Sequence, residues 1–187
     1  MRLVLASASP RRKQLIAEIE GLEVEVMASD CEENAPFTTV GGYVCALARL
    51  KAEDVYKKTG EATVGADTVV YLNRVLGKPR TEEDAKSMLR ELSGKEHEVV
   101  TGVCLIRNGK ICCRYESTVV VFDRLSEQFI DSYVKSGSPM DKAGAYGIQD
   151  EMLSPLVKEV RGCKNNVIGL PVTLLDGMIK ESCKWQK

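Results

Sequence analysis

The chain has little histidine, few aromatic residues and no excess of one charge. It contains one histidine, one tryptophan and three phenylalanines in 187 residues. Zinc sites and Ser-His or Cys-His nucleophilic catalysis would all depend on His97, so the sequence disfavours both. Its 26 basic and 27 acidic residues give a formal net charge of −1. A nucleic-acid binder usually carries a positive excess or a basic stripe with interleaved aromatic residues, so we expect no nucleic-acid partner.

Long hydrophobic runs and several familiar motifs are also missing. The apolar runs span only a few residues, far below the roughly 20 that cross a bilayer, so we expect no membrane association. There is no G-x-x-x-x-G-K-[ST], no G-x-G-x-x-G and no H-E-x-x-H. These absences disfavour P-loop nucleotidases, Rossmann dehydrogenases and zinc hydrolases.

The seven cysteines show no C-x-x-C spacing and form an odd set. A chain of this length can bury a core without disulfides, so we interpret them as reduced thiols. The segment Met1–Arg12 lacks the pattern of a secretory signal, because its apolar stretch runs directly into two arginines. Both observations favour a cytoplasmic protein.

Alternating strand and helix patterns predict the α/β class. An Asn-Gly pair at 108–109 lies between apolar runs at 99–107 and 111–122, which predicts a β-hairpin and makes the sheet mixed. Further strands are expected at 3–6, 22–27 and 62–72, and helices at 10–21, 44–60, 82–94, 126–135 and from Pro171. The predicted architecture is a mixed central β-sheet flanked by helices, either one compact unit or two lobes around a cleft.

The segment Ser7-Ala8-Ser9-Pro10-Arg11-Arg12 follows the first predicted strand and opens the first predicted helix. Ligands of open α/β sheets gather at such junctions, and hydroxyl and guanidinium groups suit a phosphate. Ser7, Ser9, Arg11 and Arg12 are therefore candidate phosphate ligands. Ordinary helix capping followed by a solvated basic turn is the alternative.

Two acidic positions are candidate metal ligands. Asp67 interrupts an apolar run, and a carboxylate there must be paired, metal-bound or neutralised. Glu32 and Glu33 lie in an acidic stretch, and together with Asp67 they offer the oxygen ligands that Mg²⁺ requires. The alternatives are an edge-strand aspartate facing water and a solvated acidic loop.

Three further residues are candidates for substrate handling. Lys51 lies on the apolar side of its predicted helix, and Lys78 lies in a Gly-Lys-Pro turn. Gln149 ends a glycine-rich stretch, and its amide can both donate to and accept from a nucleobase edge. Lysines that extend into water and a plain turn before a strand are the alternatives. Cations plus carboxylates without a protein nucleophile fit metal-assisted attack of water on a phosphoanhydride.

The sequence resembles the Maf family of nucleoside triphosphate pyrophosphatases, the septum-formation-inhibitor-like proteins. The matching pieces lie in the family's order over nearly the whole chain: LASASPRR at 5–12, Glu-Glu at 32–33, LARLKA at 47–52, VGADTVV at 64–70, GKP at 77–79, LSGKEHEVVTGV at 92–103, DKAGAYGIQ at 141–149 and GLPV at 169–172. The chain departs from the family pattern at 150–151 and at 162–166.

The resemblance implies one domain over residues 1–187, similar to inosine triphosphate pyrophosphatases in fold. It implies hydrolysis of a nucleoside triphosphate to the monophosphate and pyrophosphate, with Mg²⁺ or Mn²⁺ as cofactor. By position, Asp67 resembles the catalytic proton acceptor, and Glu33 a metal-handling carboxylate. The groups that resemble phosphate-handling residues are Ser7, Arg11, Lys51 and Lys78.

The same resemblance addresses specificity and assembly. Thr68 together with Arg12 and Gln149 is similar to the branch that hydrolyses dTTP and UTP, and the resemblance suggests a homodimer. Two alternatives stay open. One is a pyrophosphatase for 7-methyl-GTP or another purine nucleotide, and the other is a non-catalytic nucleotide-binding regulator of cell division.

Overall fold

The computed structural model describes residues 1–185, and the predicted strands and helices recur in it. The strands are β1 (Arg2–Leu5), β2 (Glu23–Val26), β3 (Thr63–Leu72), β4 (Arg74–Leu76), β5 (Glu96–Arg107), β6 (Lys110–Phe122) and β7 (Val157–Arg161). The helices are α1 (Pro10–Ile16), α2 (Val40–Thr59), α3 (Glu82–Leu92), α4 (Glu127–Lys135), α5 (Lys164–Ile168) and α6 (Val172–Ser182). Short 3₁₀ turns cover Ser138–Asp141, Ala143–Ala145 and Ser154–Leu156.

The strands form one mixed sheet in the order β2-β1-β3-β5-β6-β7, with β4 paired to β3. β1 pairs in parallel with β2 and β3, whereas β3 with β4 and β6 with β7 are antiparallel. The predicted mixed α/β sheet flanked by helices is therefore confirmed, whereas the cleft between two lobes stays a prediction.

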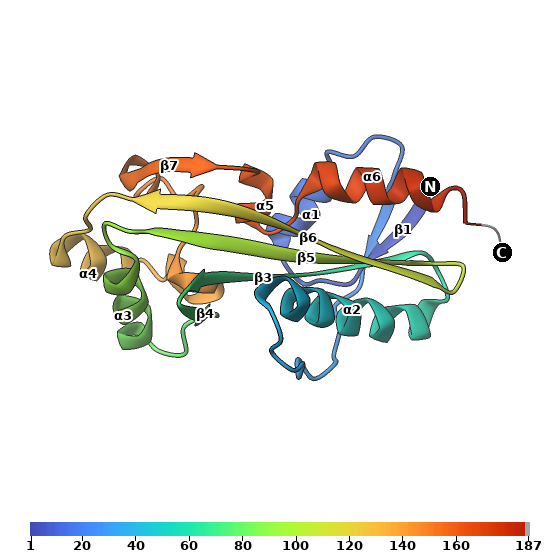
Figure 1. The fold of residues 1–187 in the computed structure, drawn as a ribbon, viewed down its shortest axis with the longest axis horizontal. Helices are drawn as coiled ribbons and strands as arrows, with labels where there is room; N and C mark the ends of the chain where they lie inside the picture. Colours follow the sequence, from blue (N-terminus) through green and yellow to red (C-terminus); the bar gives the residue numbers. More distant parts are fainter. Residues whose placement is uncertain (186–187) are drawn as a thin grey trace. The chain divides into compact units, whose positions relative to one another are not determined.

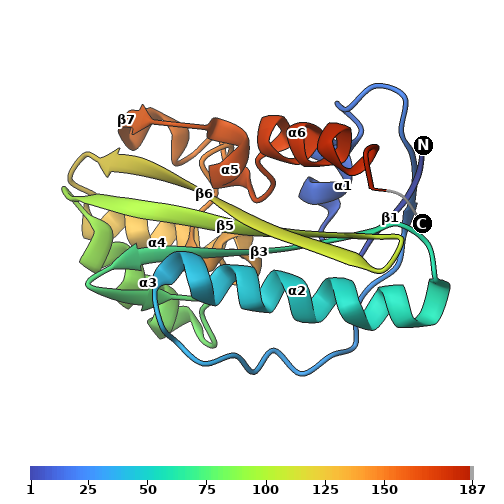
Figure 2. The same cartoon turned by 45° about the vertical axis from the view of Figure 1, so that its right-hand side comes forward.

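The chain divides into two compact units, and three long strands contribute residues to both. The first unit contains residues 1–68, 101–116 and 169 onward, and the second contains residues 69–100 and 117–168. Within the first unit, α2 covers one face of the sheet, and α1 and α6 cover the other (Figures 1 and 2). Arg107 and Arg114 of the hairpin bond to Ser182 and Glu181 of α6.

Helix α2 lies unusually close to the strands of the first unit because two glycines leave room for its backbone. A Cβ at Gly65 of β3 would lie 2.2 Å from the carbonyl oxygen of Ala48, and one at Gly102 of β5 would lie 2.4 Å from that of Val44. A side chain does not fit at either position, so the missing Cβ atoms fix the height of α2 above the sheet.

The second unit has its own apolar core beneath α3 and α4. Leu89 and Leu92 of α3 and Ile130 and Tyr133 of α4 are at most 1% exposed, and they pack in the same cluster as Phe122. Hydroxyl side chains cap the N-termini of three helices: Ser9, Thr81 and Ser126 accept from the first-turn amides of α1, α3 and α4.

Several boundaries differ from the sequence predictions. α1 ends at Ile16 rather than near Gly21, because tight turns follow it and Gly21 adopts a φ of 75°. α2 begins at Val40 rather than Val44, since Thr39 caps it. β4, β7 and α5 were not predicted, because they are short and because β7 has no buried residue that would give it an apolar pattern. Among residues 1–185, no helix combines the length and apolar character needed to cross a membrane.

Candidate active site in the first unit

The first unit contains a change of direction in strand order at β1. From β1 the chain passes through α1 to β2 on one side, and it returns through α2 to β3 on the other side. Ligands of open α/β sheets bind at the carboxyl ends of the strands at such a point. Ser7 follows the end of β1, and Asp67 lies three residues beyond Val64, which pairs with Leu5. The sheet topology thus places these two predicted residues at the same end of neighbouring strands.

Arg12 is held in place by three hydrogen bonds from its guanidinium group. Nε donates to the carbonyl oxygen of Gly169 at 2.8 Å, Nη2 to Oγ1 of Thr68 at 3.1 Å, and Nη1 to Oγ of Ser7 at 3.4 Å. The Thr68 hydroxyl also lies 2.9 Å from Oγ1 of the fully buried Thr101. These contacts bring together Ser7, Arg12 and Thr68, which the sequence analysis assigned to substrate binding.

Lys51 joins the two predicted metal-handling carboxylates. Its Nζ donates to Oδ1 of Asp67 at 2.6 Å and lies 3.0 Å from Oε1 of Glu33. The side chains of Lys51 and Asp67 are only 13% and 12% exposed, whereas Glu33 is 57% exposed. Lys51 therefore does not extend into water, and Asp67 is a paired carboxylate rather than one that faces water. The roles of both residues in catalysis stay predictions.

The charges of Arg12, Asp67 and Glu33 act on one another. Burial lowers the pKa of Arg12, and the negative charges of Asp67 and Glu33 oppose that shift. Both carboxylates thus lie within electrostatic reach of the guanidinium group as well as of Lys51. The result is one half-buried site that combines two acids with at least two cations. Its ammonium and guanidinium groups are of the kind that bind phosphate oxygens.

The start of α1 carries the candidate phosphate ligands Ser9 and Arg11, whose roles stay predictions. α1 has only seven residues, and Oγ of Ser9 accepts from the amide of Arg12 at 3.4 Å. The Ser9 amide in turn donates to Oγ of Ser7 at 3.2 Å. Ser9 therefore acts as the cap that shapes the turn, and Arg11 lies half-buried on the first turn with a charge that reaches Arg12.

Lys78 and Gln149 lie in the second unit, where both side chains are exposed. The amide of Gly144 donates to the carbonyl oxygen of Gly77 at 3.0 Å, so the segments that carry these two residues are bonded to each other. Their roles in substrate handling stay predictions.

Asp150, next to Gln149, is the hydrogen-bonding centre of that segment. Its Oδ2 accepts from the Tyr133 hydroxyl at 2.5 Å and from the Ser138 hydroxyl at 2.7 Å. The Tyr133 hydroxyl also accepts from the amide of Gly147 at 3.1 Å. The acidic residue at the family departure therefore holds the glycine-rich segment in shape.

Sequence reasoning missed two partners of the site. Thr101 and the carbonyl group of Gly169 both support the Arg12–Thr68 contact, but neither was assigned a role. A fully buried hydroxyl in an apolar strand was the available signal for Thr101. A backbone carbonyl 157 residues from Arg12 leaves no signal in the sequence.

Glu33 and Asp67 suit a hard divalent cation as part of a larger ligand set. Both place a carboxylate oxygen within 3.0 Å of one cationic atom, so the two acids are able to share a cation. Residues 1–185 contain no cluster of three or more His, Cys, Asp or Glu side chains arranged to hold a metal. Mg²⁺ commonly uses one or two carboxylates with substrate phosphates, and the donors present fit that pattern.

Comparison with known proteins identifies the family. A family model described as Maf-like protein matches residues 2–182. The chain belongs to the Maf family. Proteins named dTTP/UTP pyrophosphatase from Bacillus cereus (strain AH820) and Bacillus anthracis are each 44% identical to it over 188 residues, covering 96% of this chain and 95% of theirs.

Solved structures with the same fold are more distant in sequence. A HAM1 protein from Coxiella burnetii superposes with a TM-score of 0.59 at 17% identity, covering 97% of this chain and 99% of that one. The Ham1 protein of Staphylococcus aureus gives a TM-score of 0.57 at 12% identity, covering 97% and 100%. These similarities support the fold predicted from the resemblance to inosine triphosphate pyrophosphatases.

Proposed function

We propose that this Maf-family chain hydrolyses dTTP and UTP to the monophosphate and pyrophosphate, assisted by a divalent metal ion. The observation that carries the proposal is the contact of Lys51 with both Asp67 and Glu33, within electrostatic reach of Arg12 on α1. The names of the 44% identical relatives support the choice of nucleotides. The proposal treats residues 1–187 as one catalytic domain.

In this proposal the residues divide the work of breaking the bond between the α and β phosphorus atoms. Asp67 accepts a proton from the attacking water, which adds to the α phosphorus while pyrophosphate leaves. Arg12 and Lys51 balance the charge that develops on the phosphate oxygens, and Ser7 donates its hydroxyl to them. Glu33 and Asp67 would hold Mg²⁺ or Mn²⁺, which supplies further charge neutralisation. As the family resemblance implies, Lys78 is a phosphate-handling group, and Gln149 contributes to the specificity for dTTP and UTP.

The reaction class is tested by product analysis. Purified protein is incubated with dTTP, UTP, GTP and 7-methyl-GTP in the presence of Mg²⁺ or Mn²⁺, and pyrophosphate and orthophosphate are assayed separately. We expect pyrophosphate from dTTP and UTP. Release of orthophosphate would contradict attack at the α phosphorus. Preference for 7-methyl-GTP would support the purine alternative, and tight binding without turnover would support the regulator.

The role of Asp67 is tested with a matched pair of variants. Asp67→Asn keeps the size of the side chain but removes the proton acceptor, so we expect almost complete loss of kcat with nucleotide binding retained. Asp176→Asn is the control, because it removes one partner of an exposed ion pair with Lys180 on α6. An Asp67→Asn variant that keeps more than about a tenth of the wild-type kcat, a barrier change below ~1.4 kcal/mol, would show that Asp67 is not the base.

A further inference from the structure

Two cysteines lie directly opposite each other in the hairpin of β5 and β6. The hairpin turn has two residues, Asn108 and Gly109, with φ angles of 52° and 74°. Two positive φ angles define the type I′ turn, in which the flanking residues pair. Arg107 therefore pairs with Lys110, and counting back from the turn places Cys104 opposite Cys113.

The far end of the same hairpin confirms this register. Counting from the turn places Lys95 opposite Phe122, and the amide of Phe122 donates to the carbonyl oxygen of Lys95 at 3.0 Å. Hydrogen-bonded pairs thus fall on odd-numbered positions of β5, and Cys104 belongs to a non-hydrogen-bonded pair. Cα atoms in such pairs lie about 4.5 Å apart, which falls within the ~4.4–6.8 Å range of disulfides.

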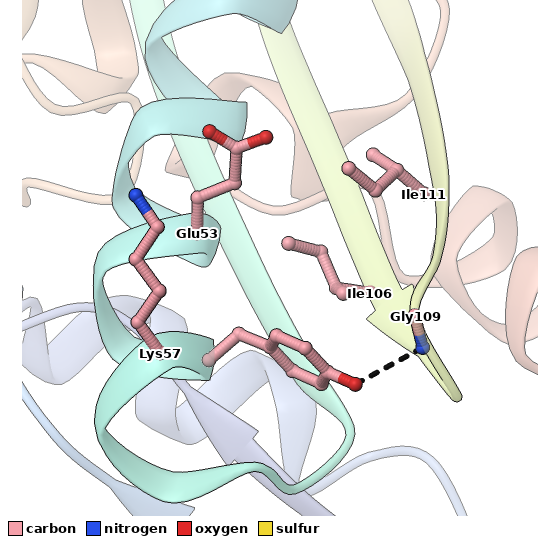
Figure 3. Close-up of a pocket in the computed structure, with 6 residues that line it drawn as sticks. Glu53, Lys57, Ile106, Gly109 and Ile111 are labelled. Atoms are coloured by element: carbon pink, nitrogen blue, oxygen red, sulfur yellow. Dashed lines mark hydrogen bonds between the residues drawn. The ribbon is translucent and has the colours of Figure 1, made fainter.

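Both thiols face helix α2 and touch each other. Cys104 and Cys113 pack in one cluster with Ala48 and Ala52 of α2, and their side chains form a hydrogen bond. The next pair on this face is Ile106 and Ile111, which line an open pocket beside α2 (Figure 3). Solvent therefore reaches the helix-facing side of the hairpin within one residue pair of the two cysteines.

The two sulfur atoms differ in exposure and in acidity. Cys104 is fully buried, and Cys113 is half-buried. The hydrogen bond with Cys104 lowers the pKa of Cys113, whereas the same bond and burial raise the pKa of Cys104. Cys113 is thus the thiol that reacts first, with Cys104 as its resolving partner. Nearby Cys45 is a poor competitor, because burial raises its pKa to about 11.

We propose that Cys104 and Cys113 are a site of reversible oxidation that forms a cross-strand disulfide with hydrogen peroxide as the oxidant. The Cys113 thiolate attacks one peroxide oxygen, the O–O bond breaks, and hydroxide leaves a sulfenic acid on Cys113. The Cys104 sulfur then attacks the Cys113 sulfur, so that the S–S bond forms, the S–O bond breaks and water leaves. In total, two thiols and one peroxide give one disulfide and two waters. The site is independent of the proposed pyrophosphatase activity.

The test is mass spectrometry of the folded protein after brief treatment with hydrogen peroxide and alkylation of the remaining thiols. Trypsin releases Cys104 in peptide 96–107 and Cys113 in peptide 111–114. We expect a disulfide linking these two peptides, with fragmentation placing the bridge on Cys113 and with dithiothreitol restoring both free thiols. Sulfinic acid on Cys113 without the link, or a bridge on Cys112, would overturn the proposal.

Neighbouring cysteines provide matched variants for the same assay. Cys112→Ser alters the adjacent residue, which lies near Arg114 on the other face of β6, so the link should persist. Cys113→Ser and Cys104→Ala should each abolish the link, and circular dichroism checks that both variants fold. Cys45→Ser should leave the link intact. Loss of the link in Cys45→Ser or Cys112→Ser, or its persistence in Cys113→Ser, would contradict the assigned pair.

Discussion

The ion pair of Lys51 and Asp67 allows a quantitative test of the site geometry by stability alone. Nζ and Oδ1 are 2.6 Å apart, and the two side chains are 13% and 12% exposed. Removing one partner of a buried pair costs about 3–5 kcal/mol, because the other charge is left without compensation. Because both side chains are slightly exposed, we expect Lys51→Met to lower the free energy of unfolding by about 3 kcal/mol, the lower end of this range. Asp67→Asn should cost less, about 2 kcal/mol, because Lys51 retains Glu33 at 3.0 Å.

The measurement is a double-mutant cycle in urea, followed by far-UV circular dichroism. The double variant Lys51→Met/Asp67→Asn should be more stable than the sum of the single losses predicts, by at least about 1.5 kcal/mol. Arg49 and Glu53 on the same helix provide the control, since they lie 2.7 Å apart but are 54% and 27% exposed. The double-mutant cycle of Arg49 and Glu53 should give a coupling energy below about 1 kcal/mol. Losses at Lys51 and Asp67 that add within about 0.5 kcal/mol would refute the buried coupling.

Burial lowers the pKa of His97 from 6.5 to about 4. Between pH 6.5 and about 4 the unfolded chain therefore binds more protons than the folded chain. The free energy of unfolding should fall by up to about 1.4 kcal/mol per pH unit as the pH drops through this window. Urea unfolding from pH 7 to 4 checks this, and an equal slope in His97→Gln would contradict it. In the same assay, Gly65→Ala should lower the free energy of unfolding by about 1–3 kcal/mol, because the new Cβ clashes with the carbonyl oxygen of Ala48. Gly177→Ala on α6 is the control: its Cβ has no neighbour within 4 Å, so this change should not destabilise the protein. Arg12→Lys should raise KM for the nucleotide, because a lysine cannot reproduce the three-way contact. A lower Tm with an unchanged KM would assign Arg12 a purely structural role.

Local sequence patterns predicted most of the fold, because turn and cap chemistry acts over a few residues. The Asn108-Gly109 turn and the Ser126 cap illustrate this, since each needs only its nearest neighbours to form. The start of α2 was misplaced because Gly41 and Gly42 disfavour a helix locally. In the structure, the Tyr115 ring occupies the space beside Gly41, which is a contact between distant segments.

The site was predictable in composition but not in arrangement. Residue chemistry identified Ser7, Arg12, Lys51 and Asp67 as members of one polar site, and the first unit brings them together. The sequence did not predict that a single ammonium group contacts both acids, since that depends on the height of α2 above β3. The backbone partner of Arg12 was equally inaccessible, because any residue type supplies the same carbonyl group.

The bond from Arg12 to Gly169 has a consequence for the order in which the protein matures. The first unit is assembled from three separate stretches, and the last begins at Gly169, so the carbonyl group that Arg12 requires is synthesised 157 residues after the arginine itself. A domain made from one stretch can fold on the ribosome as it emerges. Here the guanidinium group reaches its final position only after translation has passed Gly169, so in a nascent chain stalled earlier Arg12 lacks one of its three hydrogen bonds.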